Sequence, residues 1–288
     1  MGPVQLKAEY PKLDKRRMCP NCRAFVTSDD KICPYCQAHL GERIIDRRAP
    51  SDVLGGLIPH QRFVTTLILL INTGMYLATM LRTTQEGGSG FGDPSLQTLV
   101  DFGAKYPPYI FYRGEWWRLI TAAYLHGGLL HIGMNAWVLF DLGPQVNQTF
   151  GTSRFLTIYT VSSVTGYLAS LYWSPAVSIG ASAGLCGLIG AMIAFGTREG
   201  SALGSAIRRQ YIQWVIYLLI FGLLPGFNVD NAAHLGGLAG GFVLAYIAGT
   251  PSFSGAVENF WRLAAGLSVA ATGWAFFEMF MHLTSAAS

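Results

Sequence analysis

Residues 232–249 read AAHLGGLAGGFVLAYIAG, a stretch that contains no Asp, Glu, Lys or Arg. An α-helix needs about 20 mainly apolar residues to cross about 30 Å of hydrocarbon, so this stretch is predicted to span a membrane. Its glycines recur at a spacing of four, as in Gly237 and Gly241, and small residues at this spacing let two membrane helices approach closely. The stretch therefore predicts a membrane protein whose helices pack through glycine-lined faces.

Six further apolar runs flank this stretch. The seven predicted spans are approximately Phe63–Leu81, Leu125–Val146, Phe155–Trp173, Gly180–Gly196, Tyr211–Leu224, Ala232–Gly249 and Phe260–Leu283. The composition agrees, because 51% of the residues are hydrophobic and only 12% are charged, about half the charged fraction of a typical soluble domain. We therefore expect an all-α polytopic membrane protein and exclude the soluble and disordered classes.

The positive charges predict how the chain is oriented. With a cytoplasmic N-terminus, sixteen of the twenty Lys and Arg residues fall on the cytoplasmic side, where such residues accumulate in membrane proteins. The same rule explains why eleven of them lie within residues 1–62, so nucleic acid is not expected as a partner despite the net charge of +4. Residues 1–50 are polar and carry no apolar core, so no secretory signal peptide is expected.

Two predicted outer loops have unusual compositions. Residues 82–119 include a glycine-rich stretch at residues 87–90 and end in aromatic residues that suit the headgroup zone. Residues 173–179 carry no charge, so this loop is expected to dip below the membrane surface. Non-helical backbone at that depth is tolerated only where protein covers it or it lines a wet cavity, so the loop indicates such a cavity.

Polar residues inside predicted spans are costly and usually functional. Three groups of them fall toward the outer side in the predicted topology, although they are distant in sequence. They are His126, His131 and Asn135 in the second span, Ser182 in the fourth and His234 in the sixth.

These residue types suit nucleophilic catalysis. Ser182 stands in GASAG, residues 180–184, where glycines allow a sharp turn into a helix. A serine hydroxyl becomes a nucleophile when a base accepts its proton, and the neutral imidazole of His234 is the candidate base. The Ser182 backbone N–H, the Asn135 amide and the His131 ring are candidate donors to an oxyanion. The alternative is that Ser182 serves helix packing, but packing does not need the three histidines.

Glycines also line the fourth span, at Gly180, Gly184, Gly187 and Gly190. We therefore expect the fourth and sixth spans to be in direct contact. Such contact would bring His234 within hydrogen-bonding reach of Ser182, although the glycine faces alone do not fix the register.

Together these motifs resemble the rhomboid intramembrane proteases. The resemblance covers roughly residues 115–245, about half of the chain, and the seventh span resembles the extra C-terminal helix of one rhomboid subgroup. It rests on His126-xxxx-His131-xxx-Asn135, Gly180-Ala181-Ser182 and His234-xx-Gly237-xxx-Gly241, in that order on alternate spans, and on Trp117-Arg118 in the first loop.

The resemblance implies a bundle of six core transmembrane helices plus a seventh C-terminal helix. It also implies an intramembrane serine endopeptidase in which Ser182 is the nucleophile and His234 the general base, with no acid and no catalytic cofactor. His131 and Asn135 would stabilise the oxyanion and His126 would support them, whereas Trp117-Arg118 would be structural. Substrates would be transmembrane segments of other proteins, which reach the buried, water-filled cavity sideways between the second and fifth spans.

Two residues depart from the family's pattern. Ala183 follows the serine where glycine is common, and Cys186 stands where an aromatic residue often packs on the catalytic imidazole. Cys186 is not expected to be a rival nucleophile, because buried thiols normally behave as small hydrophobes. Asp230 lies one turn before His234, but an acid at a helix start is more simply read as a cap than as a third triad member.

Four of the five cysteines form two CxxC pairs that are ten residues apart. This spacing predicts a tetrahedral zinc site with Cys19, Cys22, Cys33 and Cys36 as ligands, and redox-active pairs are the alternative. Residues 17–40 are too few to bury a core unaided, so a structural zinc would supply most of the folding energy, as in the short zinc ribbons that the module resembles. We expect residues 1–50 to form a cytoplasmic region with this module, open to an unidentified cytoplasmic partner, and residues 51–288 to form the protease domain.

Two other functions compete with the protease. A catalytically inactive rhomboid-like scaffold that binds transmembrane segments is disfavoured, because both Ser182 and His234 are present. A channel or transporter is disfavoured because the sequence has no obvious inverted repeat and no line of charges across the bilayer. The expected partners are the lipid bilayer and transmembrane protein substrates, and the cell membrane is the default location.

Overall fold

The computed structural model describes residues 16–19, 22, 24–27, 30–40, 62–88, 92–224, 229–252 and 254–285. Its contacts divide the chain into two compact units, Met1–Val53 and Leu54–Ser288, and each is described by itself. The predicted boundary between residues 50 and 51 lies outside the described residues, as do residues 89 and 90 of the glycine-rich stretch.

The small unit contains a two-stranded antiparallel sheet. Strand β1 (Arg16–Met18) pairs with strand β2 (Phe25–Thr27). Each CxxC pair closes a similar turn, because the N–H of its first cysteine donates to the carbonyl five residues later. These bonds join Cys19 to Ala24 and Cys33 to Ala38, both at 2.9 Å. The repeated turn presents two cysteines from each half of the module.

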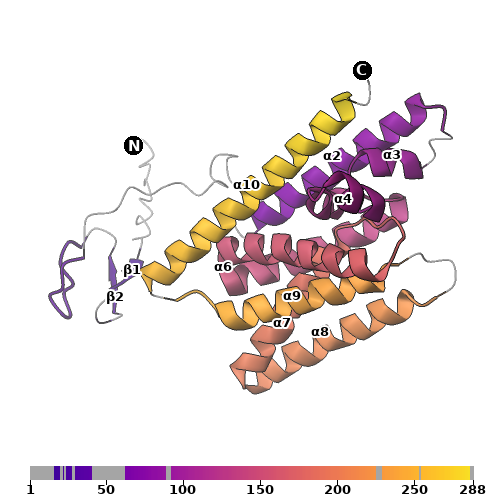
Figure 1. The fold of residues 1–288 in the computed structure, drawn as a ribbon. Coiled ribbons are helices and arrows are strands. Elements are labelled where there is room, and N and C mark those ends of the chain that lie inside the picture. Colours follow the sequence, from indigo (N-terminus) through magenta and orange to yellow (C-terminus); the bar gives the residue numbers. More distant parts are fainter. Residues whose placement is uncertain are drawn as a thin grey trace, which may run out of the picture. The chain divides into compact units, whose positions relative to one another are not determined.

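The described part of the large unit is built from helices (Figure 1). They are α2 (Phe63–Gln85), α3 (Leu96–Asp101), α4 (Pro107–Arg113), α5 (Arg118–Thr121), the 3₁₀ turn η2 (Ala122–Tyr124), α6 (Leu129–Trp173), α7 (Ser182–Glu199), α8 (Ala202–Phe221), α9 (Asn231–Ala248) and α10 (Gly255–Ser285). The six long helices correspond to the seven predicted spans within a few residues at their ends, since α6 accounts for two of the spans. The predicted all-α polytopic membrane fold is confirmed.

Helix α6 joins the second and third predicted spans without a loop. Gly151 has φ 77° and ψ 163°, which interrupts the helical geometry, so two helices meet at this residue. Glycine adopts a positive φ readily because it has no Cβ atom. A single residue thus replaces the connection that the sequence pattern placed between residues 146 and 155.

Helix α8 begins at Ala202, well before the predicted fifth span. Ser201 caps it by accepting a hydrogen bond from the Gly204 N–H at 3.0 Å. The apolar pattern missed this start because Arg208 and Arg209 interrupt the hydrophobic run. They do not interrupt the helix, since long charged side chains near the end of a span can extend to the interface.

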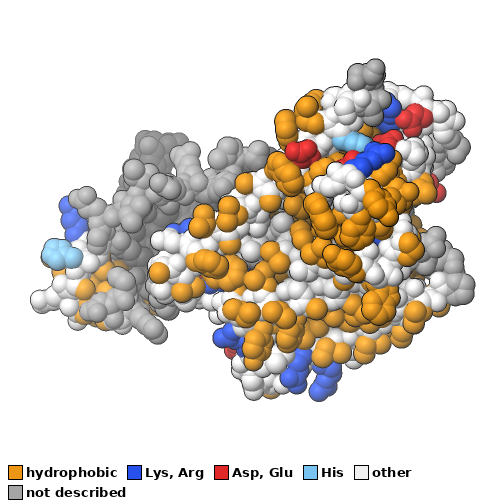
Figure 2. All heavy atoms as spheres, in the orientation of Figure 1, with side chains coloured by type: hydrophobic (Ala, Val, Ile, Leu, Met, Phe, Trp, Pro, Cys, Tyr) orange, Lys and Arg blue, Asp and Glu red, His pale blue; other side chains and the backbone are white. Residues whose placement is uncertain are grey.

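The surface of the large unit suits a bilayer. Among the described helices, α2, α9 and α10 are each long and apolar enough to cross a membrane. Figure 2 shows hydrophobic side chains over much of the visible face of the bundle, with charged side chains gathered toward its two ends. An apolar surface of this extent marks a lipid-facing region, so the large unit is an integral membrane domain.

Helices α7 and α9 pack with their backbones in contact. A Cβ atom at Gly237 would overlap the carbonyl oxygen of Ala183, and one at Gly241 would overlap that of Gly187. Only glycine allows this approach. The predicted contact between the fourth and sixth spans is confirmed, and the contacts also fix the register that the sequence left open.

Candidate active site

The loop between α6 and α7 delivers Ser182 to the start of α7. Gly180 has a φ of +125°, and a Cβ atom there would lie 2.7 Å from His131 Nε2. The Gly180 N–H donates to Ala122 O at 2.9 Å, and the Tyr167 hydroxyl donates to Gly180 O at 2.7 Å. The turn before Ser182 therefore requires glycine and is fixed on both sides of the peptide.

His234 lies in the first turn of α9 and contacts Ser182. The distance from His234 Nε2 to Ser182 Oγ is 2.9 Å. When the hydroxyl donates in this bond, Nε2 is the acceptor and the neutral ring carries its proton on Nδ1. Only 5% of His234 is exposed, and Nδ1 has no hydrogen-bond partner among the described residues.

Asp230 caps α9 and does not complete a triad. Its Oδ1 accepts a hydrogen bond from the Ala233 N–H at 2.9 Å, and its Oδ2 accepts one from the Ser170 hydroxyl. The interpretation of this acid as a helix cap is confirmed.

His131 lies beside the turn that carries Ser182. Its Nδ1 accepts a hydrogen bond from the Gly127 N–H at 3.3 Å, so the proton of the neutral ring is on Nε2. Because Nε2 is the ring atom nearest to where a Cβ atom of residue 180 would lie, this N–H is on the side of the ring that faces the Ser182 turn. When the Ser182 hydroxyl donates to His234, the two rings carry their protons on opposite nitrogens.

The other two predicted residues flank His131. The His126 and His131 rings meet edge to face, with centroids 5.1 Å apart, and His126 is fully buried. Asn135 follows one turn later, and its amide donates to His131 O at 2.8 Å. An amide nitrogen has two N–H donors, so the second remains for another acceptor. The structure brings Ser182, His234 and His131 together, with His126 and Asn135 one contact further out.

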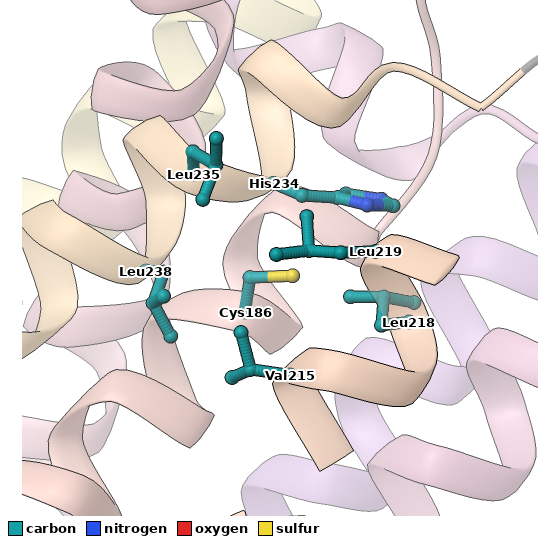
Figure 3. A pocket seen from close by; sticks show the side chains of 7 residues that line it. All are labelled: Cys186, Val215, Leu218, Leu219, His234, Leu235 and Leu238. Atoms are coloured by element: carbon teal, nitrogen blue, oxygen red, sulfur yellow. The ribbon is translucent and has the colours of Figure 1, made fainter. Parts of the chain in front are cut away.

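A small cavity adjoins the His234 ring (Figure 3). Its volume is about 10 Å³, which is room for about one water molecule. Helices α7, α8 and α9 supply its lining: Cys186, Val215, Leu218, Leu219, His234, Leu235 and Leu238. Because the Cys186 side chain is small, the space beside the ring is incompletely filled.

The cysteines of the small unit form a second candidate site. The sulfur atoms of Cys19, Cys22, Cys33 and Cys36 all lie within 4.8 Å of one another. The Cys19–Cys36 and Cys22–Cys33 sulfur distances are both 3.6 Å, too long for a disulfide. Tetrahedral zinc with bonds of about 2.3 Å places its sulfur ligands about 3.8 Å apart, so the four thiols fit this metal.

Comparison with known proteins shows where the large unit belongs. The family model of the rhomboid domain matches residues 113–251. The candidate rhomboid protease YdcA of Bacillus subtilis is 34% identical over 139 residues, which are 46% of this chain and 68% of that protein. This chain belongs to the rhomboid family.

Further rhomboid relatives match a similar region. Rhomboid protease GluP of Bacillus subtilis is 39% identical over 160 residues, 56% of this chain and 31% of GluP. The mitochondrial RHOMBOID-like protein 6 of Arabidopsis thaliana is 37% identical over 160 residues, 54% of this chain and 52% of the relative. The chain therefore spans about half or less of these two relatives. The matched rhomboid domain contains α5 to α9 and excludes α10 and the cysteines of the small unit.

The Trp117-Arg118 pair of the rhomboid domain makes structural contacts. Arg118 is fully buried, donates to Glu115 Oε2 at 2.6 Å and lies over the Trp117 ring. It also donates to the carbonyl oxygens of Val100 in α3 and of Ala104 in the segment that follows, which anchors both.

Sequence reasoning missed two residues near the site. Tyr167 fixes the Gly180 carbonyl, and Lys105 binds the loop that leads to Ser182. In the charge count, Lys105 was only one of the four Lys and Arg residues on the outer side. The uncharged composition of residues 173–179 was the available signal, because such a loop needs partners for its carbonyl groups.

Proposed function

We propose that this rhomboid is an active intramembrane serine endopeptidase that hydrolyses peptide bonds in or near transmembrane segments. The observation that carries the proposal is the 2.9 Å contact between His234 Nε2 and Ser182 Oγ. The names of GluP and YdcA describe proteases or candidate proteases, which supports the same reaction class.

The reaction follows from the orientation of the two side chains. His234 Nε2 accepts the Ser182 proton while Oγ attacks the peptide carbonyl and forms a tetrahedral intermediate. The imidazolium then donates this proton to the leaving amine as the C–N bond breaks, which leaves an acyl-enzyme. Water attacks the ester with His234 again as base, and the acid product and free Ser182 hydroxyl are released.

The negative oxygen of the intermediate needs hydrogen-bond donors. His131 Nε2–H is on the side of the ring that faces the Ser182 turn, and Ser182 begins α7, so its backbone N–H has no partner within that helix. We assign both to the oxyanion, together with the second N–H of Asn135. His126 supports the His131 ring by edge-to-face contact.

Helix α8 is the element past which a substrate would enter from the lipid. Gly204 and Tyr211 are the buried residues among its described positions, so the rest of the helix is held weakly by protein. Its contact with α6 includes a hydrogen bond from the Tyr211 hydroxyl to Gln145 Oε1 at 3.0 Å. A single-span substrate entering between α6 and α8 would reach Ser182 without leaving the bilayer.

The distribution of Lys and Arg supports an N-terminus in the cytoplasm. The cell membrane is the default location.

The four cysteines of the small unit would hold one structural zinc ion. Zinc would link the two turns of a module whose buried apolar residues are few. We assign residues 1–50 to this cytoplasmic region and residues 51–288 to the protease domain. The chemistry of Ser182 and His234 needs no cofactor.

The proposal is tested with purified protein in liposomes that contain single-span substrates. Wild type should cleave them, whereas Ser182→Ala and His234→Ala should lose cleavage while they remain folded and still bind substrate. Normal cleavage by Ser182→Ala would overturn the mechanism. Binding without cleavage by the wild type, and no labelling of Ser182 by a fluorophosphonate probe, would instead identify the inactive scaffold.

A further inference from the structure

A residue of the first outer loop holds the loop before Ser182. Lys105, between α3 and α4, forms an antiparallel bridge with Ser178 in which each N–H donates to the other's carbonyl at 3.0 Å. The Lys105 ammonium group also donates to Ser174 O at 2.9 Å and to Ala176 O at 2.7 Å. One residue therefore fixes three alternate positions of the α6–α7 loop.

The burial of Lys105 indicates a purpose beyond packing. Its exposed fraction is 0%, and a hydrophobic side chain would fill the same space without the cost of removing a charge from water. The segment that carries it is itself anchored, because Arg118 donates to Ala104 O at 3.3 Å. Lys105 thus connects an anchored segment to the loop that positions the nucleophile.

Asp230 holds the same loop from the side of α9. Besides capping α9, its carboxylate accepts a hydrogen bond from the hydroxyl of Ser170, near the end of α6 where this loop begins. Asp230 and Lys105 attract each other electrostatically. Ser178 lies four residues before Ser182, and Asp230 lies four residues before His234, so the two charges act on the two segments that carry the dyad.

We propose that Lys105 and Asp230 are positioning residues, which clamp the loop 174–179 between the first outer loop and α9 and thereby fix Ser182 relative to His234. The inference rests on the proposed function. Among the described residues, neither side chain is hydrogen-bonded to the Ser182 hydroxyl or the His234 ring, so both act through the loop and the helix start.

The test compares Lys105→Met with Arg154→Met. Each variant removes one buried cation. Arg154 pairs with Glu258 through two 2.8 Å hydrogen bonds near the start of α10. The start of α10 follows the C-terminal end of α9, whereas His234 lies at the N-terminal end of α9. For both, the readouts are the thermal midpoint, kcat and KM with a single-span substrate, and the rate at which a fluorophosphonate labels Ser182.

Lys105→Met should lower kcat and the labelling rate by about tenfold to a hundredfold with KM little changed, because small misplacements of reacting groups have effects of this size. Arg154→Met should lower the thermal midpoint and leave the labelling rate of the folded protein unchanged. Asp230→Asn keeps a capping oxygen and removes the charge, and it should also slow the labelling of Ser182. This second variant preserves the test if Lys105→Met does not fold.

Labelling of Lys105→Met and Asp230→Asn at the wild-type rate would overturn the clamp while leaving the protease standing. Equal loss of labelling in Arg154→Met would overturn it as well, because the effect would then be one of general destabilisation. Absence of cleavage and labelling in the wild type would be a failure of the proposed function itself.

The pH profile gives a second readout. Burial lowers the pKa of Lys105 to about 8, against the opposing effect of Asp230, so its charge should be lost above that pH. The loop residues 174–179 carry no titratable side chain. The titratable groups that interact electrostatically with Asp230, besides Lys105, are Tyr167 and His234. Between the folded-state pKa and the ordinary value, the unfolded chain binds more protons, so this lysine makes stability rise with pH. We therefore expect the activity of the wild type to fall above about pH 8 without loss of stability. The pH–activity profile of Lys105→Met should be flatter. Identical profiles for the wild type and Lys105→Met would contradict the clamp.

Discussion

At the scale of single residues, the two histidines beside Ser182 have different hydrogen-bond partners. His234 Nε2 faces the serine hydroxyl and can accept its proton, whereas His131 Nδ1 accepts from a backbone N–H and leaves Nε2–H as a donor. One imidazole is therefore suited to remove a proton and the other to stabilise negative charge. The difference arises from the hydrogen-bond partner of each ring, a backbone N–H for His131 and the Ser182 hydroxyl for His234, and not from residue type.

This division of roles predicts the effect of removing an oxyanion donor. His131→Ala should lower kcat by about a hundredfold to a thousandfold with a small change in KM, because the bond to the oxyanion forms only in the transition state. Steady-state kinetics with a single-span substrate measure this. An increase in KM of similar size with kcat unchanged would show that His131 binds substrate instead.

Cys186 provides a control for the identity of the nucleophile. It lies one turn after Ser182, is 3% exposed and lines the cavity beside His234. Cys186→Ala should retain kcat within about threefold, since the thiol acts as a small apolar side chain. The same kinetic assay checks this, and complete loss of activity in a folded Cys186→Ala protein would implicate the thiol in the chemistry.

At the scale of the helices, the site depends on how closely α7 and α9 approach. Gly241→Ala would force a Cβ atom into the carbonyl of Gly187, which is backbone and cannot move aside. Such overpacking typically costs about 1–3 kcal/mol or more, and here it would also separate Ser182 from His234. We expect a lower thermal midpoint and slower fluorophosphonate labelling.

Gly273→Ala in α10 is the matched control, because nothing lies within 4 Å of a Cβ atom at that position. Thermal unfolding should place this variant at or above the wild-type midpoint, with unchanged labelling. If Gly241→Ala behaved like Gly273→Ala, the backbone contact between α7 and α9 would not be what sets the dyad.

The helices also show which features were readable from the sequence. Each of the seven apolar runs corresponds to a long helix or to half of α6, and the glycine spacing predicted the α7–α9 contact, because both depend on patterns within one segment. The start of α8 and the junction at Gly151 were missed, because local capping and one backbone angle decide them. The burial of Lys105 depends on three residues that lie about 70 positions further along the chain, so no local pattern could reveal it.

At the scale of the whole molecule, the chain combines two units that are stabilised in different ways. The large unit buries an extensive core between long helices, whereas the small unit buries Cys19, Val26, Cys33 and Leu40 among its described residues. So few apolar side chains supply little stability, and a small domain of this kind needs a disulfide or a metal. The CxxC spacing was enough to predict the cysteine cluster, because each pair lies on one short turn.

The two modes of stabilisation predict different responses to zinc removal. Freshly prepared, reduced protein should contain about one zinc per chain by elemental analysis, and Cys33→Ser or a strong chelator should release it. Loss of the metal should unfold the small unit, seen as rapid amide exchange and proteolysis within residues 16–40, because metal binding would supply most of its folding energy. The thermal midpoint of the large unit should stay unchanged, because its buried core is formed by described residues between Val64 and Met279. An unaltered exchange pattern in residues 16–40 after complete metal removal would show that the module folds without zinc, and the cysteines would then need another explanation, such as redox pairs.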